Sequence, residues 1–226
     1  MVSARIRTMT GTHWLVLFGM VLGAWALLYA MALPEELRRA GQLYGTDFLR
    51  SLCIVTPDAA GLAKVIAMWT LMSGAMMAPT ALPAFATYDE LSHTGETRFG
   101  VLVGGYMIVW LGFAIVAGAL QMLLFRLDLV SAYGDSRSAV LSGVLLIGAG
   151  AYQFSTLKEA CLAKCRAPLS FFMQHWAEGP FRNGLRLGIV CLGCCWALML
   201  LAFVGGVMNL VFMGLATILM IIEKLP

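Results

Sequence analysis

The sequence predicts an all-α fold, a polytopic membrane helical bundle that forms a single membrane domain over residues 1–226. The chain is 61% hydrophobic and only 12% charged, whereas soluble domains carry roughly 25% charged residues. Six apolar segments approach the length of about 20 residues that a helix needs to cross a bilayer. A domain of this size cannot hide so much apolar surface from water, so we expect it to lie in a lipid bilayer.

The six expected transmembrane helices are separated by polar, glycine-containing or proline-containing connections. Pro34 closes the first apolar run, which lacks a small-residue cleavage site, so we expect a retained span rather than a signal peptide. The connections 34–61 and 158–184 mix charged and apolar residues at helical spacing, which predicts interfacial amphipathic helices. The expected spans cover residues 14–33, 62–83, 99–125, 138–157, 185–203 and 207–222.

The distribution of lysine and arginine favours cytoplasmic N- and C-termini. In that orientation, nine of the 15 basic residues lie on the cytoplasmic side and six on the other side. Basic residues accumulate in the cytoplasmic loops of membrane proteins. They are scattered here and not interleaved with aromatic residues, so nothing in the sequence supports nucleic-acid binding.

The second apolar segment carries a stripe of methionines. Met68, Met72 and Met76 recur every fourth residue and share one helix face, with Met77 beside them. Thioethers are soft ligands that suit Cu(I), although methionine is also a common filler of apolar interiors. Pro79 and Pro83 follow and are expected to break or kink this helix.

Five of the six cysteines form two clusters at helical spacing. Cys161 and Cys165 lie four residues apart in the connection 158–184, and "CLGCC" places Cys191, Cys194 and Cys195 on about half a turn of the fifth span. This spacing is a poor pattern for a disulfide framework. Both clusters fall on the cytoplasmic side in the favoured orientation, where thiols stay reduced. The remaining cysteine, Cys53, is alone and is expected to be structural.

These thiols are candidate metal ligands. Cu(I) needs two or three thiols or thioethers, whereas a structural zinc site needs four ligands, which Cys161, Cys165, Cys191 and either Cys194 or Cys195 could supply. Met199 extends the Cys195 line by one turn, and His175 is the only histidine near the thiols. The alternative is that the cysteines are small packing residues.

Polar residues and glycines also stand out in the apolar segments. Tyr106, Lys158, Glu223 and Lys224 lie near span ends, where we expect interfacial anchoring more than a functional role. Glycines four residues apart should allow close helix packing. These are the pairs Gly19 and Gly23, Gly100 and Gly104, and Gly184 and Gly188.

Several motifs together resemble a bacterial family of predicted metal-binding integral membrane proteins. They are "MWTLMSGAMMAP", "GGYMIVW", "AYQFSTLKEACLAKCRAPLSFF", "GLRLGIVCLGCCWALM", "GVMNLVFM" and the closing "EK". One departure is "FSTLK", where the family usually has a proline before Leu-Lys. The resemblance implies a polytopic protein of the bacterial cytoplasmic membrane with a thiol-rich metal site, and it implies no reaction.

The sequence therefore favours a membrane protein that binds a soft transition metal, most simply Cu(I), with zinc as the second possibility. Delivery, storage, transport and assembly of a copper enzyme are all compatible with it, and a metallochaperone or a membrane complex would be the partner. One alternative is an accessory subunit of a larger membrane enzyme complex. Another is a thiol redox enzyme, although the cysteine pairs do not lie in a βαβ setting.

Overall fold

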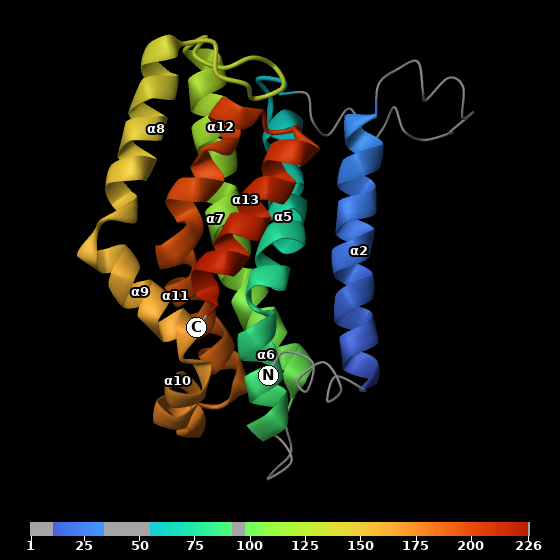
Figure 1. Cartoon of the computed structure of the whole chain (residues 1–226). Helices are drawn as coiled ribbons and strands as arrows, with labels where there is room; N and C mark the ends of the chain where they lie inside the picture. The colour runs from blue at the N-terminus through green and yellow to red at the C-terminus, as the bar shows by residue number, and fades with distance from the viewer. Residues whose placement is uncertain (1–10, 34–54, 92–97, 226) are drawn as a thin grey trace.

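Four long helices form the frame of the molecule, for which the computed structural model describes residues 11–33, 55–91 and 98–225. They are α2 (Thr12–Ala32), α5 (Ala59–Thr80), α7 (Phe99–Arg126) and α11 (Pro180–Leu200), the last extended by α12 (Ala202–Gly205). All four are long and apolar enough to cross a membrane. The described residues form no β-sheet, so the all-α bundle expected from the sequence is confirmed (Figure 1).

Two of the six expected spans correspond to helices that are short or bent. Helix α8 (Ala139–Gln153) bends by 61° into α9 (Thr156–Arg166). The Ser155 side chain caps α9 by accepting from the Lys158 N–H at 3.2 Å, which starts a new helix in a new direction. Helix α13 (Leu210–Lys224) has only 15 residues and ends part way along the bundle in Figure 1. The described residues thus hold four candidate spans, or five if α8 and α9 count as one.

The connection after α8 contains the short helices expected there. Helices α9, α10 (Pro168–His175) and the 3₁₀ turn η2 (Trp176–Glu178) run across one end of the bundle (Figure 1). Most of the other expected interfacial segment, residues 34–54, lies outside the described residues. Asp58 caps α5 by accepting from the Gly61 N–H at 2.9 Å.

The helix break expected near Pro79 and Pro83 is present. Helix α5 ends at Thr80 and the chain continues as α6 (Leu82–Leu91) after Ala81. Pro83 has no N–H to continue the α5 hydrogen-bond pattern. The break makes the last turn of α5 part of the molecule's interior, where Thr80 is 3% exposed.

Helices α7 and α11 approach each other closely through glycines. A Cβ atom on Gly184 would lie 2.1 Å from the Leu102 carbonyl oxygen, and one on Gly105 would lie 2.5 Å from the Phe181 carbonyl oxygen. The close packing expected at Gly184 and Gly188 is therefore confirmed. At the other two glycine pairs, the Cβ positions meet no atom of the described residues within 4 Å, so these glycines do not bring two described helices together.

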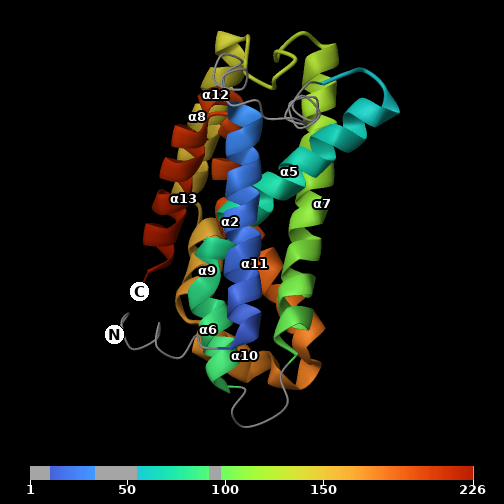
Figure 2. The same cartoon turned by 90° about the vertical axis from the view of Figure 1, so that its right-hand side faces the viewer.

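Helix α2 is attached to the edge of the bundle. Trp25 Nε1 donates to the Ala75 carbonyl of α5 at 2.9 Å, and Trp14 Nε1 donates to Asp89 Oδ2 of α6 at 2.7 Å. Figure 2, with α2 nearest the viewer, shows α5 crossing behind it at a steep angle. Much of α2 remains exposed and apolar, including Leu15 and Leu22.

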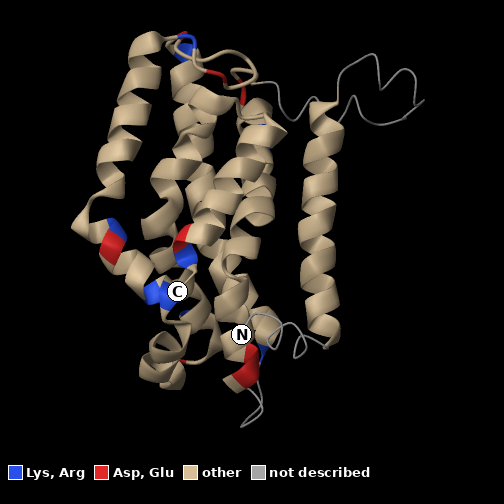
Figure 3. Ribbon diagram, viewed as in Figure 1, with Lys and Arg blue, Asp and Glu red and all other residues tan. Residues whose placement is uncertain are grey.

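Charged residues gather at both ends of the bundle and also part way along it (Figure 3). One group lies in the 127–138 connection and its surroundings, a second on α6 at the opposite end, and a third on α9 and at the end of α13, part way along the bundle. The helix surfaces between them are mainly apolar, with exposed residues such as Ile147 and Val211. Soluble proteins rarely expose apolar surface on this scale.

Candidate metal centre

Three thiols of α11 meet in the interior of the bundle. The sulfur atoms of Cys191, Cys194 and Cys195 all lie within 4.8 Å of one another, and each residue is 2% exposed or less. The Sγ atoms of Cys194 and Cys195 are 3.3 Å apart. Two sulfur atoms that share one metal ion at about 2.3 Å each cannot be more than about 4.6 Å apart. Small side-chain rotations would therefore bring these thiols, hereafter the thiol cluster, onto a single ion.

Helix α9 brings a fourth thiol to this cluster. Cys165 Sγ lies 3.9 Å from Cys194 Sγ, although the two residues are 29 positions apart. Cys165 is partly exposed, whereas Cys194 is buried. Cys165 therefore lies between the surface and the thiol cluster.

Cys161 lies one turn earlier on α9 and packs against α11. A Cβ atom on Gly193 would lie only 2.6 Å from Cys161 Sγ, so the glycine makes room for this thiol. Neither Cys161 nor Cys165 belongs to the set of thiols that are all within 4.8 Å of one another. The geometry therefore offers a trigonal set of thiols rather than a closed set of four.

An ion pair holds α9 in place beside the cluster. Lys158 Nζ donates to both carboxylate oxygens of Glu223 at 2.9 Å, and Arg166 Nε donates to the Glu223 carbonyl at 2.8 Å. The Lys158 side chain is only 4% exposed. The beginning and the end of α9 are therefore both tied to the last turn of α13.

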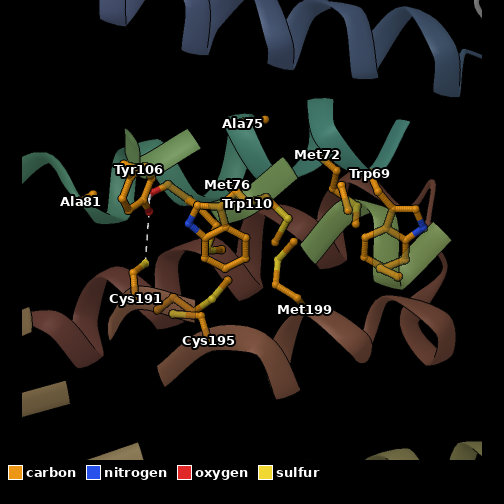
Figure 4. Close-up of a cluster of buried hydrophobic side chains, with 14 of the residues drawn as sticks. Trp69, Met72, Ala75, Met76, Ala81, Tyr106, Trp110, Cys191, Cys195 and Met199 are labelled. Carbon is orange, nitrogen blue, oxygen red and sulfur yellow. Dashed lines mark hydrogen bonds between the residues drawn. The ribbon is translucent and has the colours of Figure 1, made fainter. Parts of the chain in front are cut away.

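Three polar groups surround Cys191. Lys224 Nζ donates to Cys191 Sγ at 3.0 Å and to Thr80 Oγ1 at 2.7 Å. Tyr106 lies with its hydroxyl 3.1 Å from the same sulfur and donates to the Met77 carbonyl at 2.9 Å. Figure 4 shows Tyr106 and Cys191 pointing toward each other from opposite sides of the interior.

The interfacial anchoring expected for Tyr106 and Lys224 is wrong. Tyr106 is fully buried and Lys224 is 5% exposed. Lys224 is buried because α13 stops inside the bundle, where this last residue of the helix points at the thiols. A lysine at the end of a short apolar segment is typical of an interfacial anchor, and the same pattern is found here for a lysine that contacts the thiol cluster. Only the packing of α13 on α5 distinguishes the two.

The four candidate methionines of α5 are all buried. Met68, Met72 and Met77 are 0% exposed and Met76 is 3% exposed. Figure 4 shows Met72 and Met76 reaching from α5 toward α11, with Met199 of α11 reaching toward them. The expected stripe therefore faces the interior that also contains the thiol cluster.

His175 lies apart from the thiol cluster. Its ring packs on Phe171, and Nδ1 is 2.8 Å from the Phe171 carbonyl oxygen. It borders a groove of about 640 Å³ between α9, α10 and α11. Nearby, the Arg186 guanidinium donates to Glu178 at 2.7 Å and holds the pKa of that carboxyl below its usual range.

A cavity of about 10 Å³ adjoins the thiol cluster. That is space for about one water molecule. Its lining residues are Thr80, Ala81, Pro83, Ala84, Cys165, Leu187, Cys191 and Lys224. The site can thus accept a single ion and is too small for an organic substrate.

The fold and this site define a helical-bundle protein with a buried thiol site of the kind that binds soft metal ions. The chain belongs to the PpoB2 family of copper chaperones, whose family profile matches residues 66–226. The match contains all five cysteines of the two clusters and all four methionines of the α5 stripe. Comparison with curated proteins and with solved structures gave no significant match. Family membership and the thiol cluster together fit the handling of copper.

Proposed function

We propose that the protein is a membrane copper chaperone that takes up Cu(I) through Cys165, holds it at the thiol cluster and passes it to a copper-requiring protein. The observation that carries the proposal is the mutual approach of three buried thiols within 4.8 Å, with a fourth, partly exposed thiol 3.9 Å from one of them. Thiolates are soft ligands that select Cu(I) and zinc from the common metals.

The geometry favours Cu(I) over zinc. Structural zinc sites are almost always tetrahedral and use four protein ligands, whereas only three thiols here are mutually close among the described residues. The adjoining cavity of about 10 Å³ leaves little room for a further ligand. Copper is the cargo of this site, and Cys191, Cys194 and Cys195 would hold it.

The charge at the site suits a thiolate-bound cation. A thiol gives up its proton when it binds a metal, so three thiolates and one Cu(I) carry two negative charges. A buried net charge is costly unless an opposite charge is near. Lys224, 3.0 Å from Cys191 Sγ, supplies a positive charge and a hydrogen bond to that sulfur.

Transfer requires that the ion can leave again. Cys165 is close to Cys194 but is not part of the thiol cluster. It can therefore replace one cluster thiol as a copper ligand while the other two still hold the ion. Copper stays Cu(I) throughout, no electron moves, and each thiolate that lets go takes up a proton from solvent. A trigonal site with one exchanging neighbour fits delivery better than permanent storage.

The protein's place is the bacterial cytoplasmic membrane, with both termini on the cytoplasmic side. Four long apolar helices and their exposed apolar surfaces support this assignment. The first residues of α2 lie at the same end of the bundle as α9 and α10 (Figure 1). Cys165 would then face the reducing cytoplasm, where Cu(I) and free thiols persist. Alkaline carbonate extraction of cell membranes tests this, because an integral protein stays in the pellet.

A second role, as a subunit of a larger membrane complex, is favoured by one observation. Gly19 and Gly23 of α2 are exposed, and no atom in the described part of the chain lies within 4 Å of their Cβ positions. Small residues on an exposed face let another helix approach closely. Gentle solubilisation followed by identification of stoichiometric partners distinguishes this role, and a homogeneous protein that retains copper alone counts against it.

Copper binding by the purified protein tests the main proposal. Under reducing, oxygen-free conditions, wild type should hold Cu(I) against a chromophoric Cu(I) chelator. Removing the cluster with Cys191→Ser, Cys194→Ser and Cys195→Ser should weaken that binding by at least 100-fold. Cys53→Ser, which removes a thiol outside the described residues, is the matched control and should bind like wild type. Equal binding by wild type and the triple variant would refute the proposal.

A further inference from the structure

We infer that Met72 and Met76 of α5 and Met199 of α11 form a second, thioether-based Cu(I) site, next to the thiol cluster and deeper in the bundle. This inference rests on the proposed function, because it assigns the thiol cluster as the source of the ion. It adds a second binding site inside the same protein, and it implies that Cu(I) moves from the thiol cluster to the thioethers.

The positions of these methionines follow from helix geometry. Cys191, Cys195 and Met199 recur every four residues and share one face of α11, and Met72, Met76 and Thr80 do the same on α5. Lys224 joins the Thr80 and Cys191 ends of the two rows, since it donates to both side chains. Because the helices run in opposite directions, Met76 lies at the level of Cys195 and Met72 at the level of Met199, as Figure 4 shows.

These sulfur atoms continue the line of the thiols without an intervening charge. The line starts at partly exposed Cys165, passes Cys194 and Cys195 with sulfur separations of 3.9 and 3.3 Å, and reaches Met199 one turn further along α11. Met199 is 1% exposed and Met72 is 0% exposed. The line therefore leads from a partly exposed thiol to fully buried thioethers.

Unpaired polar atoms in this interior are a second, independent observation. Trp110 Nε1 and Ser73 Oγ have no hydrogen-bond partner among the described residues, and both residues are 0% exposed. Figure 4 shows the Trp110 ring lying among Tyr106, Cys195 and the methionines, with its nitrogen on the side of Tyr106. Buried polar groups are nearly always satisfied in native proteins. The free Trp110 N–H, at the thiol end of this row of sulfur atoms, suits a donor to a thiolate that carries bound Cu(I).

The chemistry of the second site differs from that of the first. Thioethers are neutral and have no proton to lose, so they hold Cu(I) through soft sulfur alone. Movement from thiol to thioether replaces one Cu–S bond by another while copper stays Cu(I), and the thiolate that is left takes up a proton from solvent. The weaker site lies beyond the stronger one, as expected for an ion that must leave again.

Copper stoichiometry in matched variants tests this inference. Leucine has nearly the volume of methionine, so Met72→Leu, Met76→Leu and Met199→Leu together should preserve the packing. Wild type, titrated with Cu(I) alone, should bind two ions, this triple variant one ion, and the cysteine triple variant at most one weakly held ion. Met31→Leu with Met122→Leu, which replaces two buried methionines elsewhere, should still bind two.

The outcomes separate this inference from the proposed function. If the methionine variant binds as much Cu(I) as wild type, with equal affinity, the second site is refuted and the thiol site stands. If the methionine variant loses one ion and the cysteine variant loses none, the thioether site stands and the thiol site fails. If the triple methionine variant does not fold, as judged by circular dichroism, Met199→Leu alone gives the same test.

Discussion

The ammonium group of Lys224 lies 3.0 Å from the sulfur of Cys191, at the point where α13 ends inside the bundle. The two residues are 33 positions apart, and no local pattern joins them. A positive charge thus faces one edge of a buried cluster of three thiols. In the proposed function, this charge offsets the negative charge that the thiolates bring to bound copper.

Removing that charge should weaken copper binding. Lys224→Met keeps the length of the side chain but leaves the copper–thiolate group without its positive partner, and breaking a buried charge pair costs about 3–5 kcal/mol. We expect an affinity loss of at least tenfold, the equivalent of about 1.4 kcal/mol, in a chelator competition assay. Lys164→Met, at a lysine that borders the groove between α9 and α11, is the control. Unchanged affinity in Lys224→Met would contradict the role given to Lys224.

Loosening α9 should expose Cys165. Glu223→Gln removes the acceptor of a Lys158 side chain that is only 4% exposed, which leaves a buried ammonium uncompensated. We expect α9 to detach from α13 and Cys165 to react faster with a maleimide, by at least fivefold, as measured by mass spectrometry of the labelled peptide.

Glu159→Gln changes an exposed carboxyl on the same helix and should leave the labelling rate unchanged. Exchanging both partners, with Lys158→Met and Glu223→Gln, should restore much of the protection, because no unpaired charge remains. Equal labelling rates in wild type and Glu223→Gln would show that the ion pair does not hold α9 in place.

Cys165 should control the rate of copper uptake more than its affinity. Cys165→Ser leaves the three mutually close thiols intact, so the equilibrium affinity should change by less than threefold. The rate at which copper passes from a Cu(I)-glutathione donor should fall by tenfold or more. Stopped-flow measurement of metal transfer checks this, with Cys161→Ser as the matched control on the same helix. A lower affinity with an unchanged transfer rate would show that Cys165 holds the ion and does not serve its uptake.

The packing of α7 on α11 should be intolerant of a single methyl group. A Cβ atom on Gly184 would lie 2.1 Å from the Leu102 carbonyl oxygen, which is backbone and cannot rotate away. Gly184→Ala should destabilise the protein by about 1–3 kcal/mol through overpacking, seen as a lower temperature of unfolding. Gly100→Ala is the control and should be neutral or stabilising, because no described residue comes within 4 Å of its Cβ position.

The sequence could predict the elements of the site but not all of its members. Spacings of three and four residues place side chains on one helix face, and this rule predicted that Cys191, Cys194 and Cys195 lie together and that Met72 and Met76 face one way. It also limited the helix break to the prolines around Ala81. These features depend on a single helix and need no knowledge of its neighbours.

The remaining features depend on contacts between helices that are distant in sequence. The apolar length of residues 138–157 does not reveal the 61° bend after Gln153. Lys224 resembles an interfacial anchor until α13 is seen to end at the thiols. Tyr106 reaches the site because Gly105 and Gly184 bring α7 and α11 together.

X-ray absorption at the copper edge of the wild-type protein, loaded with one equivalent of Cu(I), tests the central claim most directly. The account predicts a first shell of sulfur alone around Cu(I), which changes in the variant with Cys191→Ser, Cys194→Ser and Cys195→Ser. A first shell dominated by nitrogen or oxygen, or a spectrum that is the same in wild type and that variant, would contradict it.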